Sequence, residues 1–283
     1  MGMVSWRSII EEVKREEVRG ATWCARRIAE AFITLAQDPD YSPQLLDEAV
    51  GLALQANPSM TSIYNVVYLA RRARDREMLL EYMSRFIDYL GWARSRILES
   101  SRDSVAGVVM TISYSSTVRD LIIAAKNNIS RVYVLESSPG REGVVLAREL
   151  EKQGVDIEVL PDPSFNHYLE KTDIVLVGAD SVGKNACIVN KIGTMPLAYF
   201  AHYYGLEVYS IFEAYKIHPE KTCYEIPLHE REYKINGFKT RTPLFDRTPG
   251  KYLTAMITEH GLLKPSRIEV RRAYQQFIDQ IIR

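Results

Sequence analysis

Residues 175–194, VLVGADSVGKNACIVNKIGT, contain the pattern that decides the fold. The apolar run at 175–177 predicts a buried strand, and it leads directly into Gly178, Ala179 and Asp180. The strand therefore presents one carboxylate at its carboxyl end, beside two residues of little bulk. In open α/β sheets, ligands bind outside the carboxyl ends of the strands. The segment thus predicts a parallel sheet and, at Asp180, a candidate site.

The same segment contains an imperfect phosphate-loop pattern. Residues 178–185 spell G-x-x-x-x-G-K-N, whereas the phosphate loop of ATPases and GTPases requires Ser or Thr after the lysine and a helix directly behind it. Residues 185–189 instead predict a turn or an extended pair. We therefore do not interpret Lys184 as part of an ATP- or GTP-binding loop.

Composition excludes several classes of protein. The 283 residues include 36 Lys+Arg and 36 Asp+Glu, so the chain lacks the net positive charge of a dedicated nucleic-acid binder. The arginine run at 71–76 is more typical of a solvated helix face. We expect neither direct nucleic-acid binding nor a membrane span, because no apolar run approaches the length of about 20 residues that spanning requires.

The cysteines and histidines predict no metal site and no cofactor. Cys24, Cys187 and Cys223 are widely spaced and odd in number, which indicates free thiols and not a disulfide framework. The five histidines are scattered, with no His-x-x-x-His pair. Free thiols and an amphipathic, charged N-terminus without an apolar signal core lead us to expect a cytoplasmic protein.

The first hundred residues predict an all-helical domain. Apolar residues recur at helical spacing, for example at Trp6, Ile9, Ile10 and Val13, and prolines mark the breaks between helices. The last of these helices is expected to run from about residue 74 to residue 100. We place the domain boundary at 1–102 and 103–283, with the hinge in residues 100–104.

From Val105 the pattern changes to α/β alternation. Near-continuous apolar runs alternate with helix-period segments, which predicts a Rossmann-like, mostly parallel sheet covered on both faces. Residues 238–266, rich in proline and glycine, predict ordered loops around a final strand and helix. The expected strands are 105–113, 131–137, 156–162, 173–180 and 207–213.

Polar residues follow four of these strands. Ser113 to Ser116 follow the first strand, and Asp162 follows the third; for Ser115, Ser116 and Asp162 we favour capping of the next helix over ligand binding. Asp180 is different, because the two small residues before it leave its approach open, and we favour a functional role.

Two further elements are suited to phosphate. Lys191 and Thr194 flank Gly193 where a helix is expected to start, and helix N-termini bind phosphate oxygens. A capped helix with a surface lysine explains this pattern equally well. The Arg19-Gly20-Ala21 turn offers a guanidinium and exposed amides, although composition alone would make the turn structural.

The motifs along the chain form one ordered set, which consists of VRGATW (18–23), NPSMTSIYN (57–65), MTISYSSTV (110–118), LESSPGREG (135–143), VGADSVGKNACIVNKIGT (177–194), EAYKIHP (213–219) and LFDRTPGKYLTAMITEHG (244–261). The whole set resembles the alpha/beta/delta regulatory subunits of translation initiation factor 2B and the related isomerases of methylthioribose 1-phosphate and ribose 1,5-bisphosphate. This resemblance implies a helical N-terminal domain, a Rossmann-like C-terminal domain, and a dimer or higher homo-oligomer built on the latter.

The resemblance also assigns candidate site residues. The isomerases use an aspartate, which matches Asp180, and a cysteine in a Thr-His-Cys motif, where this chain has Thr111, Ile112 and Ser113. An alcohol without an adjacent base is a poor acid or base, so Ser113 weakens catalysis. The candidate ligand- or phosphate-binding residues are Arg19, Gly20, Ala21, Ser115, Arg141, Asn190, Lys191, Gly193, Thr194 and Lys216.

Two arginines of the isomerases are missing. Asn57-Pro58 and Glu136-Ser137-Ser138-Pro139 stand where the isomerases have Arg-Pro and Glu-Thr-Arg-Pro, and each change removes a guanidinium suited to phosphate. Arg141 partly compensates for this loss.

We therefore expect an initiation-factor-2B-like subunit that works by binding, with a retained sugar-phosphate or nucleotide pocket and initiation factor 2 as a partner. The alternative is an aldose–ketose isomerase in which Asp180 shuttles a proton and Lys191 and Arg19 hold phosphate. A metabolite sensor whose oligomer changes with ligand is a third hypothesis.

Overall fold

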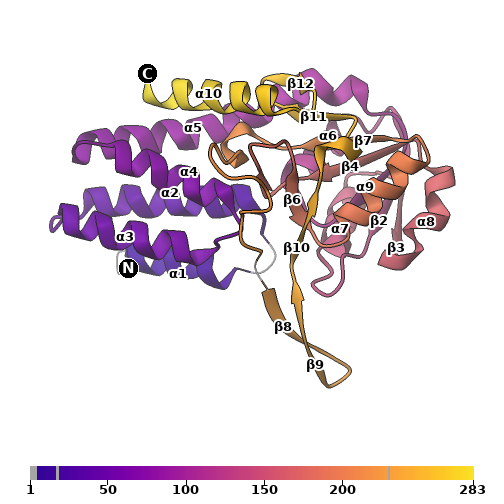
Figure 1. Ribbon diagram of the computed structural model, residues 1–283, viewed down its shortest axis with the longest axis horizontal. Coiled ribbons are helices and arrows are strands. Elements are labelled where there is room, and N and C mark those ends of the chain that lie inside the picture. Colours follow the sequence, from indigo (N-terminus) through magenta and orange to yellow (C-terminus); the bar gives the residue numbers. More distant parts are fainter. Residues whose placement is uncertain (1–4, 17–18, 229) are drawn as a thin grey trace.

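The computed structural model describes residues 5–16, 19–228 and 230–283. Val18, the first residue of the VRGATW motif, and His229 lie outside these ranges. Figure 1 shows a bundle of N-terminal helices on one side and a sheet flanked by helices on the other. The predicted fold class, a helical N-terminal part followed by a Rossmann-like α/β part, is confirmed.

Short polar caps position the N-terminal helices. Ser5, Ser42 and Asp75 each accept a hydrogen bond from a backbone N–H in the first turn of the helix that follows, and Pro43 opens α3. The apolar residues between these caps are buried toward one another. The helices are α1 (Trp6–Arg15), α2 (Ala21–Gln37), α3 (Pro43–Ala56), α4 (Thr61–Arg72) and α5 (Arg76–Ser101).

A seven-stranded sheet follows in the order β12-β11-β7-β4-β1-β2-β3, and every neighbouring pair is parallel except β11–β12. The chain builds outward from β1 through β2 and β3, then returns to the other side of β1 with β4. Such a reversal of strand order opens a crevice where ligands bind. The strands are β1 (Gly107–Ile112), β2 (Ile129–Leu135), β3 (Ile157–Leu160), β4 (Ile174–Gly178), β7 (Glu207–Ile211), β11 (Ala255–Thr258) and β12 (Gly261–Leu263).

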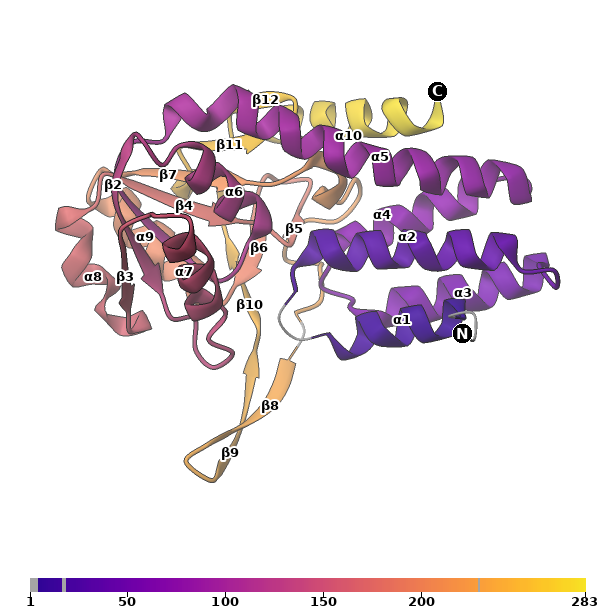
Figure 2. The same cartoon turned by 180° about the vertical axis from the view of Figure 1, so that it is seen from behind.

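Helices cover both faces of this sheet, as the pattern of buried strands predicts. Figures 1 and 2 together show α6 and α7 over one face and α9 over the opposite face. The helices after β1 are α6 (Ser116–Ala124), α7 (Glu142–Lys152), α8 (Phe165–Tyr168), α9 (Thr194–Tyr203) and α10 (Arg267–Ile282).

Two smaller sheets lie beside the main sheet. One has the order β10-β6-β5 and pairs β10 (Phe245–Thr248) with β6 (Ile188–Lys191), which in turn pairs with β5 (Ser181–Val182). The other is a hairpin of β8 (Glu230–Ile235) and β9 (Phe238–Pro243) that projects from the body (Figure 1). Residues 238–266 thus contain more strand than the loops we expected, because β10 finds its partner about 50 residues earlier in the chain.

One buried core joins the two parts of the chain. Phe277 of α10 lies with its ring beside Phe86 and Tyr89 of α5, and Phe86 packs edge-on against Tyr215. The last helix therefore returns to the N-terminal bundle and closes it. Within the described ranges, every helix is too short or too polar to span a lipid bilayer.

The expectation of three free thiols is wrong. Cys187 and Cys223 form a disulfide, with 5.6 Å between their Cα atoms, and Cys24 is the free cysteine. The pairing was hidden because the two residues are 36 positions apart, and only the turn after β5 brings them together. Among the described residues there is no cluster of His, Cys, Asp or Glu that is suited to hold a metal ion.

Candidate functional site

The candidate site lies where the strand order reverses, at the carboxyl ends of β1 and β4. Ser113 follows β1 and Asp180 follows β4, and both residues line two adjoining cavities of about 50 and 20 Å³. Gly178 allows the Ser115 side chain to lie against the end of β4, because a Cβ at position 178 would lie 3.0 Å from it. The sequence placed Asp180 correctly because parallel strands align their carboxyl ends at one edge.

Asp180 is half-buried, and its surroundings act on the charge of its carboxylate in both directions. Burial raises the pKa of Asp180, while Lys216, the Ala21 backbone amide and Lys191 act in the opposite direction. The Ala21 amide belongs to the N-terminus of α2, where Gly20 supplies no side-chain cap. The positive end of this helix therefore faces the carboxylate.

Ser113 is held in a strained backbone conformation. Its φ angle is 70°, in the left-handed region, and its amide donates to Ser137 Oγ at 2.7 Å. Ser137 itself has φ 66°, and its amide and that of Ser138 donate to Asp162. Asp162 thus fixes this turn instead of capping the following helix, which corrects our expectation for that residue.

The two lysines of the site are each paired with an internal carboxylate. Lys191 Nζ lies 3.0 Å from Glu142 Oε1, and Lys216 Nζ lies 2.9 Å from Glu213 Oε2. All four side chains are at most 11% exposed. Because charge-assisted pairs of this kind are strong in a buried setting, neither lysine is free to bind an anion without displacing its partner.

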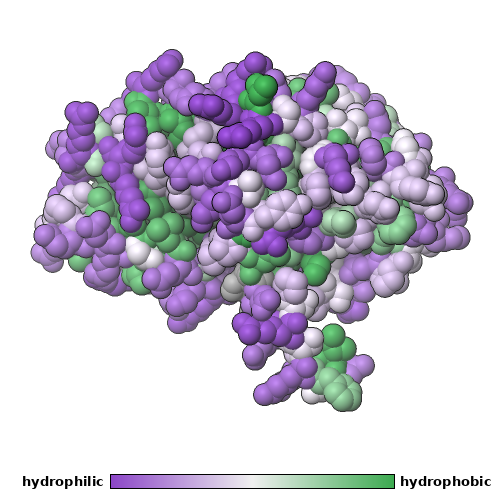
Figure 3. Space-filling view, viewed as in Figure 1, coloured by the Kyte–Doolittle hydropathy of each residue, from purple (hydrophilic) through white to green (hydrophobic). Residues whose placement is uncertain are grey.

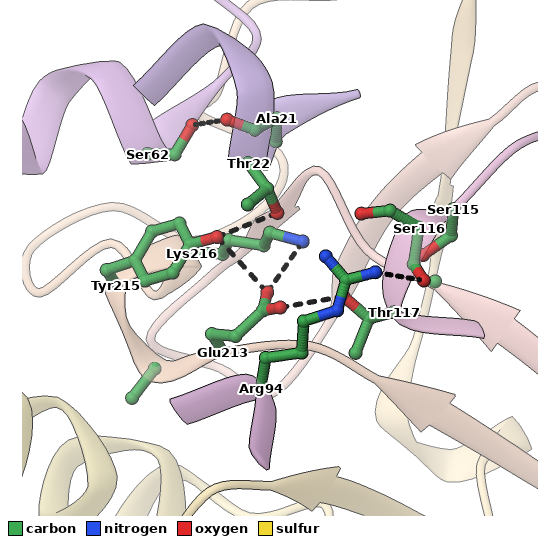
Figure 4. Close-up of polar contacts among 12 residues, drawn as sticks. Ala21, Thr22, Ser62, Arg94, Ser115, Ser116, Thr117, Glu213, Tyr215 and Lys216 are labelled. Atoms are coloured by element: carbon green, nitrogen blue, oxygen red, sulfur yellow. Dashed lines mark hydrogen bonds and ion pairs between the residues drawn. The ribbon is translucent and has the colours of Figure 1, made fainter. Parts of the chain in front are cut away.

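Glu213 is the centre of the network around Lys216. Figure 4 shows its carboxylate receiving hydrogen bonds from Thr117 and Tyr215, while Tyr215 also donates to Thr22 of α2. Burial acts to raise the pKa of Glu213, but Lys216 and Thr117 outweigh it, so the pKa is lowered. Glu213 is therefore charged at neutral pH.

The carboxylate of Glu142, unlike that of Glu213, has only one of its two oxygens hydrogen-bonded. Its Oε1 pairs with Lys191, but its Oε2 is buried and has no hydrogen-bond partner among the described residues. Glu142 is the first residue of α7, directly after Arg141, whose φ of 59° turns the chain into the helix. Sequence reasoning assigned neither carboxylate to the site, although Glu142 lies in the LESSPGREG motif and Glu213 begins the EAYKIHP motif.

The N-terminus of α9 is already occupied by a carboxylate. Asp246 of β10 accepts hydrogen bonds from the amides of Gly193 at 2.8 Å and Met195 at 3.0 Å. Burial raises the pKa of Asp246 to about 6. The amides that a phosphate would use at this helix are thus bound to the protein itself, and neither Gly193 nor Thr194 lines the two cavities.

Most of the other predicted residues are brought together. Ser115 caps α6, as expected, by accepting from the Val118 amide, and it also lines a cavity. Arg141 is the exception, because its side chain is 72% exposed and pairs with Glu136 outside the cavities. The predicted residues that line one or both cavities are Asp180, Ser113, Arg19, Gly20, Ala21, Ser115, Asn190, Lys191 and Lys216.

Cys24 does not replace the missing catalytic thiol. It lies on α2, three residues after Ala21, and is buried. Burial and the Asp180 charge raise the pKa of Cys24 to about 12. Since the thiolate is the reactive form, this cysteine is inert near neutral pH.

Comparison with known proteins identifies relatives of this chain along most of its length. Residues 17–265 match the sequence model of the initiation factor 2 subunit family. The chain is 36% identical over 267 residues to a putative translation initiation factor eIF-2B subunit 2-like protein of Pyrococcus abyssi, which covers 92% of this chain and 96% of that protein. It is 30% identical over 280 residues to a ribose 1,5-bisphosphate isomerase of Methanocaldococcus jannaschii, which covers 90% of each.

Solved structures give the same result. The crystal structure of the translation initiation factor eIF-2B from Pyrococcus horikoshii superposes with a TM-score of 0.89 at 35% identity, over 93% of this chain and 98% of that one. A 5-methylthioribose 1-phosphate isomerase of the same organism superposes with a TM-score of 0.76 at 19% identity, over 96% and 88%, which shows a shared fold. The resemblance predicted from the motifs is confirmed, and the chain belongs to the initiation factor 2 subunit family.

Proposed function

We propose that this chain is an initiation-factor-2B-like, regulatory-subunit-type protein that works by binding and not by catalysis. The observation that carries the proposal is Ser113, which shares the cavities of Asp180 where the isomerases place a thiol. The serine hydroxyl has no neighbouring base in the Thr111-Ile112-Ser113 segment. An acid–base pair able to move a proton near neutral pH is therefore incomplete.

The ligand of the proposed pocket is a small phosphorylated molecule, a sugar phosphate or a nucleotide. Lys191, Lys216 and Arg19 are the cations that would hold it. Because Glu142 and Glu213 already neutralise the two lysines, we expect weak binding that requires the Lys191–Glu142 pair to open. The buried, unpartnered Oε2 of Glu142 makes this pair the easier of the two to break.

The proposed protein partners are further copies of this chain, joined through the C-terminal part into a dimer or a higher oligomer, and initiation factor 2. Support comes from relatives named as eIF-2B subunits and from a fold shared with a tetrameric eIF2B beta2-delta2 complex. Sedimentation with and without a sugar phosphate tests both the oligomer and its response to ligand.

The second candidate function is an aldose–ketose isomerase. The raised pKa of Asp180 favours it, as does the similarity to a ribose 1,5-bisphosphate isomerase. In this mechanism Asp180 takes a proton from one carbon and returns it to the adjacent carbon, which interconverts aldehyde and ketone without a change in composition. Ser113 or a bound water would exchange the proton of the carbonyl oxygen.

An NMR assay with ribose 1,5-bisphosphate and methylthioribose 1-phosphate distinguishes the two functions. We expect line broadening or shift changes from binding, without conversion of either sugar, in the wild type. Turnover that disappears in Asp180→Asn but persists in Asp47→Asn, an exposed carboxylate on α3, would establish the isomerase instead. Absence of binding to both sugars would overturn the proposed pocket.

A further inference from the structure

A second cavity of about 390 Å³ lies away from Asp180, between α10 and the turn after β5. It is several times larger than the two cavities around Asp180, and none of its lining residues lines either of them. Three of the residues that line it are cations: Lys184 from the turn, and Arg267 and Arg271 from α10. The buried side chains of Ile217, Val270 and Tyr274 lie beneath these cations.

The charge of this cavity is unbalanced. No Asp or Glu lines it, and Lys184, Arg267 and Arg271 form no ion pair among the described residues. Arg272, the next residue on α10, contrasts with them because it pairs with Glu269 and does not line the cavity. Figure 3 shows strongly hydrophilic side chains across the middle of the face seen in Figure 1. Glu225 is close enough to Lys184 for the lysine charge to lower its pKa, so the ammonium is partly balanced, whereas the two guanidinium groups remain to attract an anion.

The turn that carries Lys184 is fixed in place by covalent and backbone bonds. The Cys187–Cys223 disulfide joins it to the 221–223 segment, and the Lys184 amide donates to the Lys221 carbonyl at 2.8 Å. Gly183 permits this close approach, because a Cβ there would lie 2.2 Å from the Cys223 nitrogen. Lys184 is thus attached to a rigid edge, which lowers the entropy lost when it binds a ligand.

His218 adds a neutral donor to the wall of the cavity. Its Nδ1 accepts hydrogen bonds from the amides of Glu220 and Lys221, both at 3.2 Å, so the proton of the neutral ring lies on Nε2. Burial and the charge of Lys221 lower the pKa of His218 to about 4, which keeps the ring neutral at pH 7. Its ring stacks on Tyr64 with centroids 4.3 Å apart.

We propose that this cavity binds a nucleoside diphosphate or a phosphate ester of similar size. Two guanidinium groups and one ammonium suit the two phosphate groups, since arginine binds phosphate in a bidentate manner. The Tyr274 ring, which keeps some exposed surface above the buried Ile217 and Val270, suits the base. Lys184 is not part of a phosphate loop, but in this proposal its side chain binds phosphate together with the arginines of α10. This site is independent of the function proposed for Asp180.

Isothermal titration calorimetry with ADP, and with adenosine and pyrophosphate as its two halves, tests the proposal on the full chain. We expect ADP to bind at least tenfold more tightly than either half, and more weakly as salt is raised. Lys184→Glu and Arg271→Glu are expected to weaken ADP at least tenfold. Arg272→Glu is the matched control, with the same charge change one residue away, and is expected to leave ADP affinity unchanged.

The outcomes separate this site from the Asp180 cavity. Loss of ADP binding in Asp180→Asn, with wild-type affinity in Arg271→Glu, would place the ligand at Asp180 and overturn the proposal. Equal weakening by Arg271→Glu and Arg272→Glu would show attraction to surface charge in general and would overturn it as well. Circular dichroism of each variant confirms that the fold is intact, and Arg271→Gln provides a milder variant if the charge reversal unfolds the chain.

Discussion

The cavities around Asp180 and the cavity beside Lys184 treat charge in opposite ways. Around Asp180, Lys191 and Lys216 are each paired with a buried carboxylate, and the space left is about 50 and 20 Å³. Beside Lys184, three cations face about 390 Å³ with no lining carboxylate. The first arrangement stabilises the protein without ligand, whereas the second leaves charge to be satisfied from solution. The cavities that resemble an enzyme pocket are therefore less suited to bind an anion than the cavity beside Lys184.

The largest contrast between the two regions is expected when one cation is removed from each. Lys216→Met leaves Glu213 buried without its cation, and the loss of one member of a buried pair costs about 3–5 kcal/mol. Arg271→Met removes an exposed charge and is expected to change the free energy of unfolding by less than about 0.5 kcal/mol. Urea denaturation at pH 7 measures both. Equal destabilisation would show that the Lys184 cavity is also a structural charge cluster.

A second prediction concerns the carboxylate behind the Asp180 network. Glu259 accepts a hydrogen bond from the Ala214 amide and one from Tyr89, and burial raises its pKa from 4.5 to about 7. Because the folded state holds this proton more tightly than the unfolded state, Glu259 favours folding below pH 4.5 and loses that contribution as pH rises through 7. The difference between the two pKa values corresponds to about 3 kcal/mol.

Glu259→Gln removes this titration. We expect the variant to gain stability over the wild type by up to about 3 kcal/mol as pH is raised from 4.5 to 8. Thermal or urea unfolding across this range measures the difference, with Glu170→Gln, an exposed carboxylate, as the control. A stability difference that is constant with pH would contradict a raised pKa and would make Glu259 an ordinary hydrogen-bond acceptor.

The smallest predicted effect concerns the affinity of the Asp180 cavities for a sugar phosphate beside Lys191. Glu142→Gln keeps the size of the side chain but removes the charge that competes with a phosphate, so affinity for ribose 1,5-bisphosphate is expected to rise about tenfold, or about 1.4 kcal/mol. Glu151→Gln, an exposed position on the same helix, is the control. Unchanged affinity, measured by calorimetry, would mean that the ligand does not reach Lys191.

The sequence predicted the parts of this molecule that follow from periodicity. Apolar runs located β1, β2, β3, β4 and β7, and parallel strands necessarily bring Ser113 and Asp180 to one edge. The rest depends on long-range contacts. Glu142 reaches Lys191 because Arg141 adopts a left-handed conformation, and no residue type encodes that angle at a non-glycine position.

The same limit explains the corrected expectations. Asp246 fills the N-terminus of α9 because β10 pairs with β6, and the Cys187–Cys223 bond forms because a turn and a distant loop meet. The spacing of residues along the chain predicts neither the contact of Asp246 with α9 nor the disulfide. Capping by Ser115 was predictable, since the capping side chain and the backbone amide that donates to it lie three residues apart.

The return of α10 to the N-terminal bundle has a consequence for synthesis in the cell. Domains generally fold as units as they leave the ribosome, N-terminal first. Here Phe86 and Tyr89 of α5 lack their neighbour Phe277 until α10 has been translated. The helical bundle therefore emerges early, with part of its aromatic surface uncovered until α10 follows. A ribosome stalled before α10 would hold a nascent protein whose first half is made and whose core is still open.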